Sequence, residues 1–469
     1  MIAFVWLSLC GLITHAFGQT DYSSCCSNFP DSSFCGCENA VIQCHGLITT
    51  PSLRQDRRCR VVDIRDSSLP IKAYDFNHIQ TDRLILSNNN LNDSNINPLA
   101  FNNMKGTLKE LVLSNNSLTA LPASVKELEH LELLDLSGNP IASNNFDDDI
   151  LRDIGDTLID LKIGGPNITS WPSSFYHLQA LQNLTITESH FTLLPVDAFH
   201  GFQGTLKELT IQHSQLTSVP LAVARLRYLE VLRFDDNYNV GDHGMRAPIV
   251  PGLLPYLYNV SLQADNITVF PQILGSFEKL QNVVLDRNRL KFVSDESAIA
   301  VNRASTLSLR DSGLTRIPEA IQRIAALDAL DLSNNKIHSV ETKDLRQLVS
   351  LKSLLFNNNP ILYMSPNALD NNVLLDRIEL RSTNLTKVPC AIRGLMAAHS
   401  HTGRSSTITV DLQFNRIQCT CELQWLYAAI TSIPSISITF EGTCDTIVMS
   451  IQDYIDSNLS SCPSGGQCS

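Results

Sequence analysis

The segment from Leu327 to Ile337 reads LDALDLSNNKI, and its pattern recurs along most of the chain. If Leu327 is position one, leucines fill positions four and six, Asn335 fills position nine and Ile337 fills position eleven. The alternation at positions four and six predicts a short strand with one buried face, and the polar residues after it predict a turn. Because one such unit cannot cover its own apolar face, the pattern predicts a stack of parallel strands, one from each copy.

We place about fifteen copies in the chain. Positions one, four, six and eleven of each copy are predicted to point inward, so the 469 residues form one long solenoid rather than two or three compact domains. The copies begin at Cys59, Thr81, Leu108, Leu131, Leu158, Leu181, Leu206, Leu229, Leu257, Leu280, Ala304, Leu327, Leu351, Leu375 and Thr407.

Position nine is asparagine in eight of these copies. An amide both donates and accepts hydrogen bonds, so a stacked row of asparagines can satisfy the backbone where each strand turns away. Most other copies have Ser, Thr or Asp there, but Pro166 cannot take this role, and we predict an altered turn at Pro166. The asparagines are Asn89, Asn116, Asn139, Asn237, Asn288, Asn335, Asn359 and Asn415.

A second period of about 49 residues covers two turns. It is marked by endings such as LTALP, ITSWP and LTRIP, and because proline disfavours helix for the residue before it, we predict extended or 3₁₀ convex segments at these places. Insertions at residues 238–255 and 386–406 interrupt the rhythm, and either functional loops or simple tolerance of extra length explains them. The prolines are Pro122, Pro172, Pro220, Pro271 and Pro318.

Cysteines gather at the two ends of the chain. Of the thirteen, Cys10 lies in the apolar segment at the start, and the remaining twelve form two clusters, as expected for disulfides in an oxidising compartment. Zinc is the competing interpretation of Cys35-Gly-Cys37 and Cys419-Thr-Cys421, but a single intervening residue is shorter than the usual zinc spacing, so we predict no metal.

The repeat is similar to the leucine-rich repeat, and the ends of the chain carry the same resemblance. The spacing C-x8-C-x-C-x6-C from Cys26 to Cys44 resembles the amino-terminal cap of extracellular leucine-rich-repeat proteins, and CTCELQWLYAAI resembles their carboxy-terminal cap. That class includes Slit-like guidance proteins, Toll-like ectodomains, small matrix proteoglycans and jawless-fish variable receptors. The chain also looks like the arthropod non-catalytic subunit of a secreted luciferase. We therefore expect an α/β solenoid, a horseshoe with a parallel sheet on its concave face.

The resemblance also implies a set of disulfides. For the first cap it implies the pairs Cys26–Cys37 and Cys35–Cys44, which leave Cys25 for Cys59, although six cysteines by themselves allow fifteen connectivities. For the second cap it implies Cys419–Cys444 and Cys421–Cys462. Cys390 and Cys468 lie outside the family pattern and are left for each other.

The first residues and the sequons favour secretion. An apolar run from Ile2 to Ile13, followed by small residues, predicts a signal peptide over residues 1–18, although a buried strand would have similar composition. We then expect a first cap at 19–58, repeats at 59–418, a second cap at 419–469 and no membrane span. Eight sequons predict glycosylation in an extracellular protein, at Asn92, Asn115, Asn167, Asn183, Asn259, Asn266, Asn384 and Asn458.

No motif in the sequence proposes a reaction. The pair His399 and His401 could touch a metal, but we favour a solvated loop, and we expect no catalysis and no cofactor. The net charge of −12 disfavours nucleic acid and anionic membranes as partners.

Binding through the concave face is the function that the repeat favours. Strand residues between the buried positions should point out of the concave sheet, and a stretch without sequons between Asn266 and Asn384 carries charges of both signs. We predict an extracellular protein ligand there, although an ordinary solvated sheet face would look the same. The alternative is a non-catalytic subunit that stabilises or positions a secreted enzyme. The candidate residues are Asp286, Arg287, Arg310, Asp311, Asp331, Arg377, Glu379 and Arg381.

Overall fold

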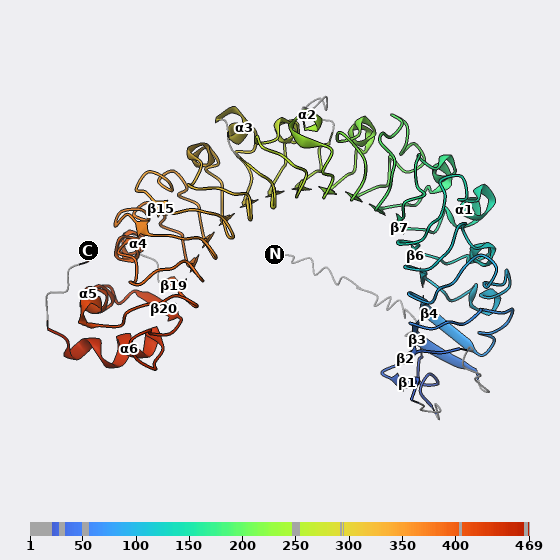
Figure 1. The fold of residues 1–469 in the computed structure, drawn as a ribbon, viewed down its shortest axis with the longest axis horizontal. Helices are drawn as coiled ribbons and strands as arrows, with labels where there is room; N and C mark the ends of the chain where they lie inside the picture. Colours follow the sequence, from blue (N-terminus) through green and yellow to red (C-terminus); the bar gives the residue numbers. More distant parts are fainter. Residues whose placement is uncertain are drawn as a thin grey trace, which may run out of the picture.

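A computed structural model describes residues 21–27, 33–48, 56–245, 254–290, 293, 295–402, 406–463 and 468. They form one curved solenoid in which short strands line the concave side and helices lie on the convex side (Figure 1). The predicted α/β horseshoe with a parallel concave sheet is confirmed. The predicted signal peptide, residues 1–18, lies outside the described residues.

The concave sheet has eighteen strands in the described part of the chain. The number of strands that come from repeats matches the predicted number of copies, and each pairs in parallel with the next. These strands are β3 (Arg57–Arg65), β4 (Ile79–Ile85), β5 (Glu110–Val112), β6 (Leu133–Asp135), β7 (Asp160–Gly164), β8 (Asn183–Thr187), β9 (Glu208–Gln212), β10 (Val231–Asp235), β11 (Asn259–Ser261), β12 (Asn282–Val284), β13 (Thr306–Ser308), β14 (Ala329–Asp331), β16 (Ser353–Leu355), β18 (Arg377–Glu379) and β19 (Ser406–Asp411).

Each cap extends the sheet at one end. In the first cap, β1 (Cys35–Glu38) and β2 (Val41–His45) form an antiparallel hairpin, and β2 pairs in parallel with β3. In the second cap, β20 (Ile436–Glu441) pairs in parallel with β19. The helices of the second cap are η7 (Cys421–Leu423), α5 (Gln424–Ser432), α6 (Ile451–Ser457) and η8 (Leu459–Ser461).

The convex side is built mostly from short 3₁₀ segments. Those following the five repeated prolines begin directly after them, as predicted, because proline fixes an extended residue at each start. These segments are η2 (Ala123–Val125), η3 (Ser173–His177), η4 (Leu221–Arg225), η5 (Gln272–Ser276) and η6 (Glu319–Arg323). The remaining elements are η1 (Asn102–Met104), α1 (Asp148–Ile154), α2 (Gly241–Gly244), α3 (Asp295–Ala300), α4 (Ala391–Ser400) and the small outer sheet of β15 (Ser339–Val340) and β17 (Tyr363–Met364).

The core runs without interruption through the stacked turns. In the turn that begins at Leu327, the side chains of Leu327, Leu330, Leu332 and Ile337 are all 0% exposed. Each packs against its counterparts in the neighbouring turns, so burial is complete only inside the stack.

Position eight of every copy has a left-handed backbone. In fourteen copies its φ lies between 49° and 68°, and residues as unlike as Asn334, Arg287 and Phe414 adopt it. The exception is Gly165, whose φ is 150° and which directly precedes Pro166. The predicted alteration of the turn at Pro166 is therefore confirmed.

The asparagines of position nine form the predicted ladder. The Asn335 side-chain amide donates to the carbonyl of Leu309 in the preceding turn at 2.8 Å and to that of Leu332 at 2.9 Å. Its oxygen accepts from the backbone N–H groups of Ser312 and Leu314, each at 3.0 Å. The same pattern recurs at Asn116, Asn139, Asn288, Asn359 and Asn415.

One rung of the ladder carries a carboxyl group instead of an amide. Asp265 is 0% exposed, and its Oδ1 accepts from the Asn237 N–H at 2.8 Å. Its Oδ2 is buried without a hydrogen-bond partner among the described residues. Burial, together with the charges of Asp235 and Asp236, raises the pKa of Asp265 to about 9. Asp265 is therefore held as the neutral acid, which keeps one proton to donate.

We expect Asp265→Asn to raise the free energy of unfolding by about 1–3 kcal/mol near pH 7, because a buried unpaired polar group carries that cost. In the unfolded chain Asp265 ionises near pH 4, so between pH 4 and about 9 the native state binds the extra proton and its stability falls as pH rises. The gain in the variant should therefore grow across this range in urea unfolding. A gain that does not change with pH would contradict a neutral Asp265, and Asn288→Asp is the matched destabilising control.

Candidate functional site

The concave strands β12, β13, β14, β16 and β18 present the predicted surface. In these strands the middle residue, position four, is buried, and position five on β13 and β14 is half-buried at the concave side. The strands pair in register, so residues of one position form a row across the sheet. At about 4.8 Å between strands, neighbouring side chains in a row can contact one another.

Several of the predicted charges on this surface contact groups at other positions of the repeat. Arg310 Nε lies 3.7 Å from Asp331 Oδ2, and Arg377 donates to Glu379 Oε1 from Nε at 2.8 Å and from Nη2 at 2.6 Å. Asp286 accepts from the Ser308 hydroxyl at 2.6 Å and from the backbone N–H of Arg310 at 2.9 Å. Asp311 is exposed in the left-handed position eight of its turn.

Arg381 extends this network into the second cap. Its guanidinium donates to Asp411, which is 2% exposed, and its Nη2 lies 3.9 Å from Glu441 on β20. Asp411 and Glu441 are direct neighbours in the parallel pairing of β19 with β20. The charged surface therefore continues beyond the predicted residues.

Arg287 points away from the other candidates. It donates from Nη1 and Nη2 to the two carboxylate oxygens of Asp236, each at 2.9 Å, across an intervening turn. The neighbouring Asp235 is buried and accepts from the Ser261 hydroxyl at 2.7 Å and the Gln263 N–H at 2.8 Å. Arg310 contacts Asp331 and Asp286 near β13 and β14, and Arg377, Glu379 and Arg381 form a separate group near β18 that includes Asp411. Arg287 belongs to a third group near β10.

Sequence reasoning missed four acidic members of these groups. Asp235, Asp236 and Asp411 occupy positions seven, eight and five of their copies, so extending the same columns beyond the chosen turns would have found them. Glu441 follows the last repeat and has no periodic signal.

Burial and hydrogen bonding act in opposite directions on these carboxyl groups. Burial alone would raise the pKa of Glu379, but hydrogen bonds from Asn357 and Arg377, with the charges of Arg377 and Arg381, hold it below its ordinary value. Burial raises the pKa of Asp286 and of Asp235 despite their hydrogen bonds. Glu379 is therefore a firmly ionised partner for the arginines around it.

Six of the eight sequons lie on the concave strands or in the turns that directly follow them. Asn183 starts β8 and Asn259 starts β11, and both are half-buried. Asn115, Asn167, Asn266 and Asn384 lie in the turns that follow the strands. Since the described surface between Asn266 and Asn384 carries no sequon, the group around Arg310 is free of predicted glycans.

The prediction of a solvated loop at His399 is wrong. The insertion at 386–406 contains α4, whose residues Ile392, Leu395 and Met396 are each 0% exposed. His399 is 3% exposed, its Nε2 lies 3.0 Å from the Leu375 carbonyl oxygen and its Nδ1 lies 2.9 Å from the Ser406 hydroxyl. The insertion forms the helix α4, whose apolar residues pack into the core, and this packing accounts for the position of His399.

Six disulfides close the two ends. Four pairs coincide with those that the resemblance implied: Cys26–Cys37, Cys35–Cys44, Cys419–Cys444 and Cys421–Cys462. The cysteines left over in the prediction are also bonded to each other, as Cys25–Cys59 and Cys390–Cys468. No helix in the described ranges is both long and apolar enough to cross a bilayer.

Comparisons with known proteins agree with the fold. A family profile described as leucine rich repeat matches residues 79–141 and 278–337. Podocan of Mus musculus is 25% identical over 245 residues, which cover 45% of this chain and 39% of podocan. Monocyte differentiation antigen CD14 of Bos taurus is 25% identical over 173 residues, which cover 35% of this chain and 45% of CD14. This chain therefore matches less than half of the length of either relative.

Solved structures show the same fold. A leucine-rich-repeat protein of Leptospira interrogans aligns with a TM-score of 0.52 at 20% identity, over 81% of this chain and 95% of that one. A chain from the Toll–Spatzle complex of Drosophila aligns with a TM-score of 0.53 at 14% identity, over 85% of this chain and 68% of that one. The chain is therefore a leucine-rich-repeat solenoid. More narrowly, it is one whose two ends carry disulfide-bonded caps.

We expect His399 to make the fold sensitive to acid. Burial lowers the pKa of His399, so between that value and the ordinary value near 6.5 the unfolded state binds more protons and stability falls with falling pH. Thermal unfolding of wild type and His399→Gln should show a difference in melting temperature that shrinks from pH 7.5 to pH 5. His401→Gln is the control, because His401 is exposed. An unchanged difference would contradict a buried neutral imidazole.

Proposed function

We propose that this protein acts outside the cell as a recognition module that binds a protein ligand through the concave surface of β12 to β19. The observation that carries the proposal is a concentration of oppositely charged side chains on that surface, in two groups: Asp286 with Arg310 and Asp331, and Glu379 with Arg377 and Arg381. It has no role in burying the core, and both signs of charge are presented side by side. Such mixed charge favours a polar protein surface over a uniformly charged polymer.

Disulfides in both caps support a place outside the cell, because such bonds persist in oxidising compartments. The relatives include proteins named podocan and Toll-like receptor 2. The acidic side chains Asp286, Asp331 and Glu379 are half-buried or buried, and hydrogen bonds from their neighbours hold Asp286 and Glu379, which reduces the entropy lost on binding. These features support binding rather than a reaction of the protein's own.

Predicted glycans limit the part of the concave face that a ligand can contact. Glycans on Asn183 and Asn259 would cover the middle of the concave face, so the ligand should contact the later strands. Arg381, which Asp411 holds in place, and Glu441 then extend the contact toward the second cap.

The first experiment is affinity capture by the secreted, glycosylated protein from its own extracellular fluid, with mass spectrometry of what is retained. The retained protein is then produced alone, and its affinity is measured by surface plasmon resonance. A receptor or matrix protein with a defined stoichiometry supports recognition. A single secreted enzyme at constant ratio supports instead the alternative of a non-catalytic subunit.

We expect the charge swap Arg310→Asp with Asp331→Arg to weaken that binding at least tenfold. The swap keeps an ion pair within the protein but reverses the charges that the ligand meets, so the fold should be retained. The control is the same kind of swap on the convex side, Asp295→Arg with Arg323→Asp, whose charges lie 3.0 Å apart. Equal affinity for wild type and both variants would exclude this surface as the binding site.

A further inference from the structure

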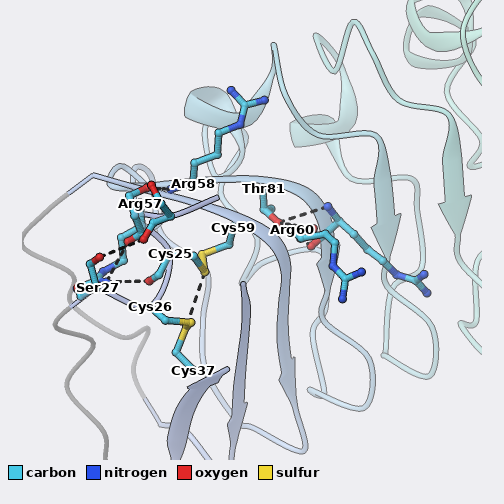
Figure 2. Close-up of a disulfide and its surroundings, with 12 residues drawn as sticks. Cys25, Cys26, Ser27, Cys37, Arg57, Arg58, Cys59, Arg60 and Thr81 are labelled. Carbon is cyan, nitrogen blue, oxygen red and sulfur yellow. Dashed lines mark hydrogen bonds between the residues drawn. A yellow bond between two sulfur atoms is a disulfide. The ribbon is translucent and has the colours of Figure 1, made fainter. Parts of the chain in front are cut away.

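Two disulfides of the first cap lie against each other. Cys25 is bonded to Cys59 and the adjacent Cys26 to Cys37, and the Sγ atoms of Cys25 and Cys37 are 3.7 Å apart (Figure 2). Within the described chain, the sulfur atoms of Cys25, Cys26 and Cys37 form the one group of three possible metal-ligand atoms that lie within 4.8 Å of one another. The sulfur of one disulfide is therefore already in contact with the other.

The two bonds differ in access to solvent. Cys25 and Cys59 are each 0% exposed, whereas Cys26 and Cys37 are partly exposed. An external thiol can reach the bond between Cys26 and Cys37 but not the one between Cys25 and Cys59. The buried bond can be reached only from within, through Cys37.

A buried guanidinium holds the segment that carries both cysteines. Arg57 is 5% exposed, and its Nη1 donates to the carbonyl oxygens of Cys25 and Ser27, each at 2.8 Å. Because β3 carries Arg57 as well as Cys59, Cys25 stays in place when one bond in the cap opens.

We infer that the first cap is a thiol–disulfide exchange site. A small thiol forms a mixed disulfide with Cys26, and the exchange leaves Cys59 as the free thiol. The thiolate of the incoming molecule attacks Cys26 Sγ, forms a mixed disulfide there and releases Cys37 as a thiolate. Cys37 then attacks Cys25 Sγ, the bond between Cys25 and Cys59 breaks, and Cys59 leaves as a thiolate that takes up a proton. One disulfide is exchanged at each step, so no oxidant or reductant beyond the thiol is consumed.

The exchange changes what the cap is attached to. In the starting form, the Cys25–Cys59 bond ties the first described residues to β3, the first strand of the repeats. In the exchanged form, Cys25 is tied to β1, which stays closed on β2 through Cys35–Cys44. The cap remains cross-linked within itself, but the disulfide that ties it to β3 is lost.

The test uses the intact glycoprotein and glutathione. The protein is incubated with a limiting amount of glutathione, quenched with acid, alkylated with iodoacetamide and digested without reduction for mass spectrometry. We expect glutathione on Cys26, a peptide pair joined through Cys25 and Cys37, and alkylation of Cys59. Alkylation of Cys37 with Cys25–Cys59 intact would overturn the inference, as would the absence of glutathione from the first cap.

A pair of variants separates contact between sulfurs from general reactivity. Cys26→Ser leaves Cys37 unpaired beside the Cys25–Cys59 bond, and we expect the Cys25–Cys37 pair with a Cys59 thiol to form without added glutathione. The matched control is Cys421→Ser, which leaves Cys462 unpaired in the second cap, where no third sulfur lies as near in the described residues. Cys462 should remain a free thiol. Exchange in both variants, or in neither, would overturn the inference.

Discussion

The turn after each strand is the constraint on which the rest of this structure depends. A left-handed residue at position eight sends the backbone out of the sheet, and the amide at position nine hydrogen-bonds the carbonyls and N–H groups that the turn leaves behind. Without those bonds, buried polar groups would remain unpaired at every turn, at a cost of about 1–3 kcal/mol each. The strands, the concave face and the stacking of the core all follow from repeating this one arrangement.

The repeated apolar spacing was enough to predict a stack of parallel strands, because positions four and six alternate and Asn335 suits a buried turn. The horseshoe shape was implied by the resemblance to the leucine-rich repeat. The proline endings predicted the 3₁₀ segments for a similarly direct reason. Position eight shows where such reasoning stops. Arg287, Ala264 and Phe414 have no preference for left-handed backbone, and they adopt it because the ladder on either side requires it.

The candidate site was predictable as far as the columns of the repeat extend. Arg310, Asp331 and Glu379 lie on the concave side as expected, but their partners depend on contacts between turns that spacing does not specify. Asp236 reaches Arg287 across an intervening turn, and Glu441 comes from the second cap. The burial of His399 also escaped prediction, because the small and apolar residues around it suit a loop or a helix equally well.

The concave strands differ in length, and this difference coincides with a change in the residue at position nine. From β7 to β10 they have five residues, whereas β6 and β11 have three, and this longer section includes the turns with Pro166 and Ser189 at position nine. There, the backbone N–H groups of Gly165 and Glu188 still donate to the carbonyl oxygens of Thr187 and Gln212 in the following turns, at 3.2 and 3.1 Å. Because Pro166 offers no side-chain hydrogen bond and the Ser189 hydroxyl is buried without a partner among the described residues, position nine of these two turns is expected to tolerate mutational drift that the asparagine-bearing turns would not.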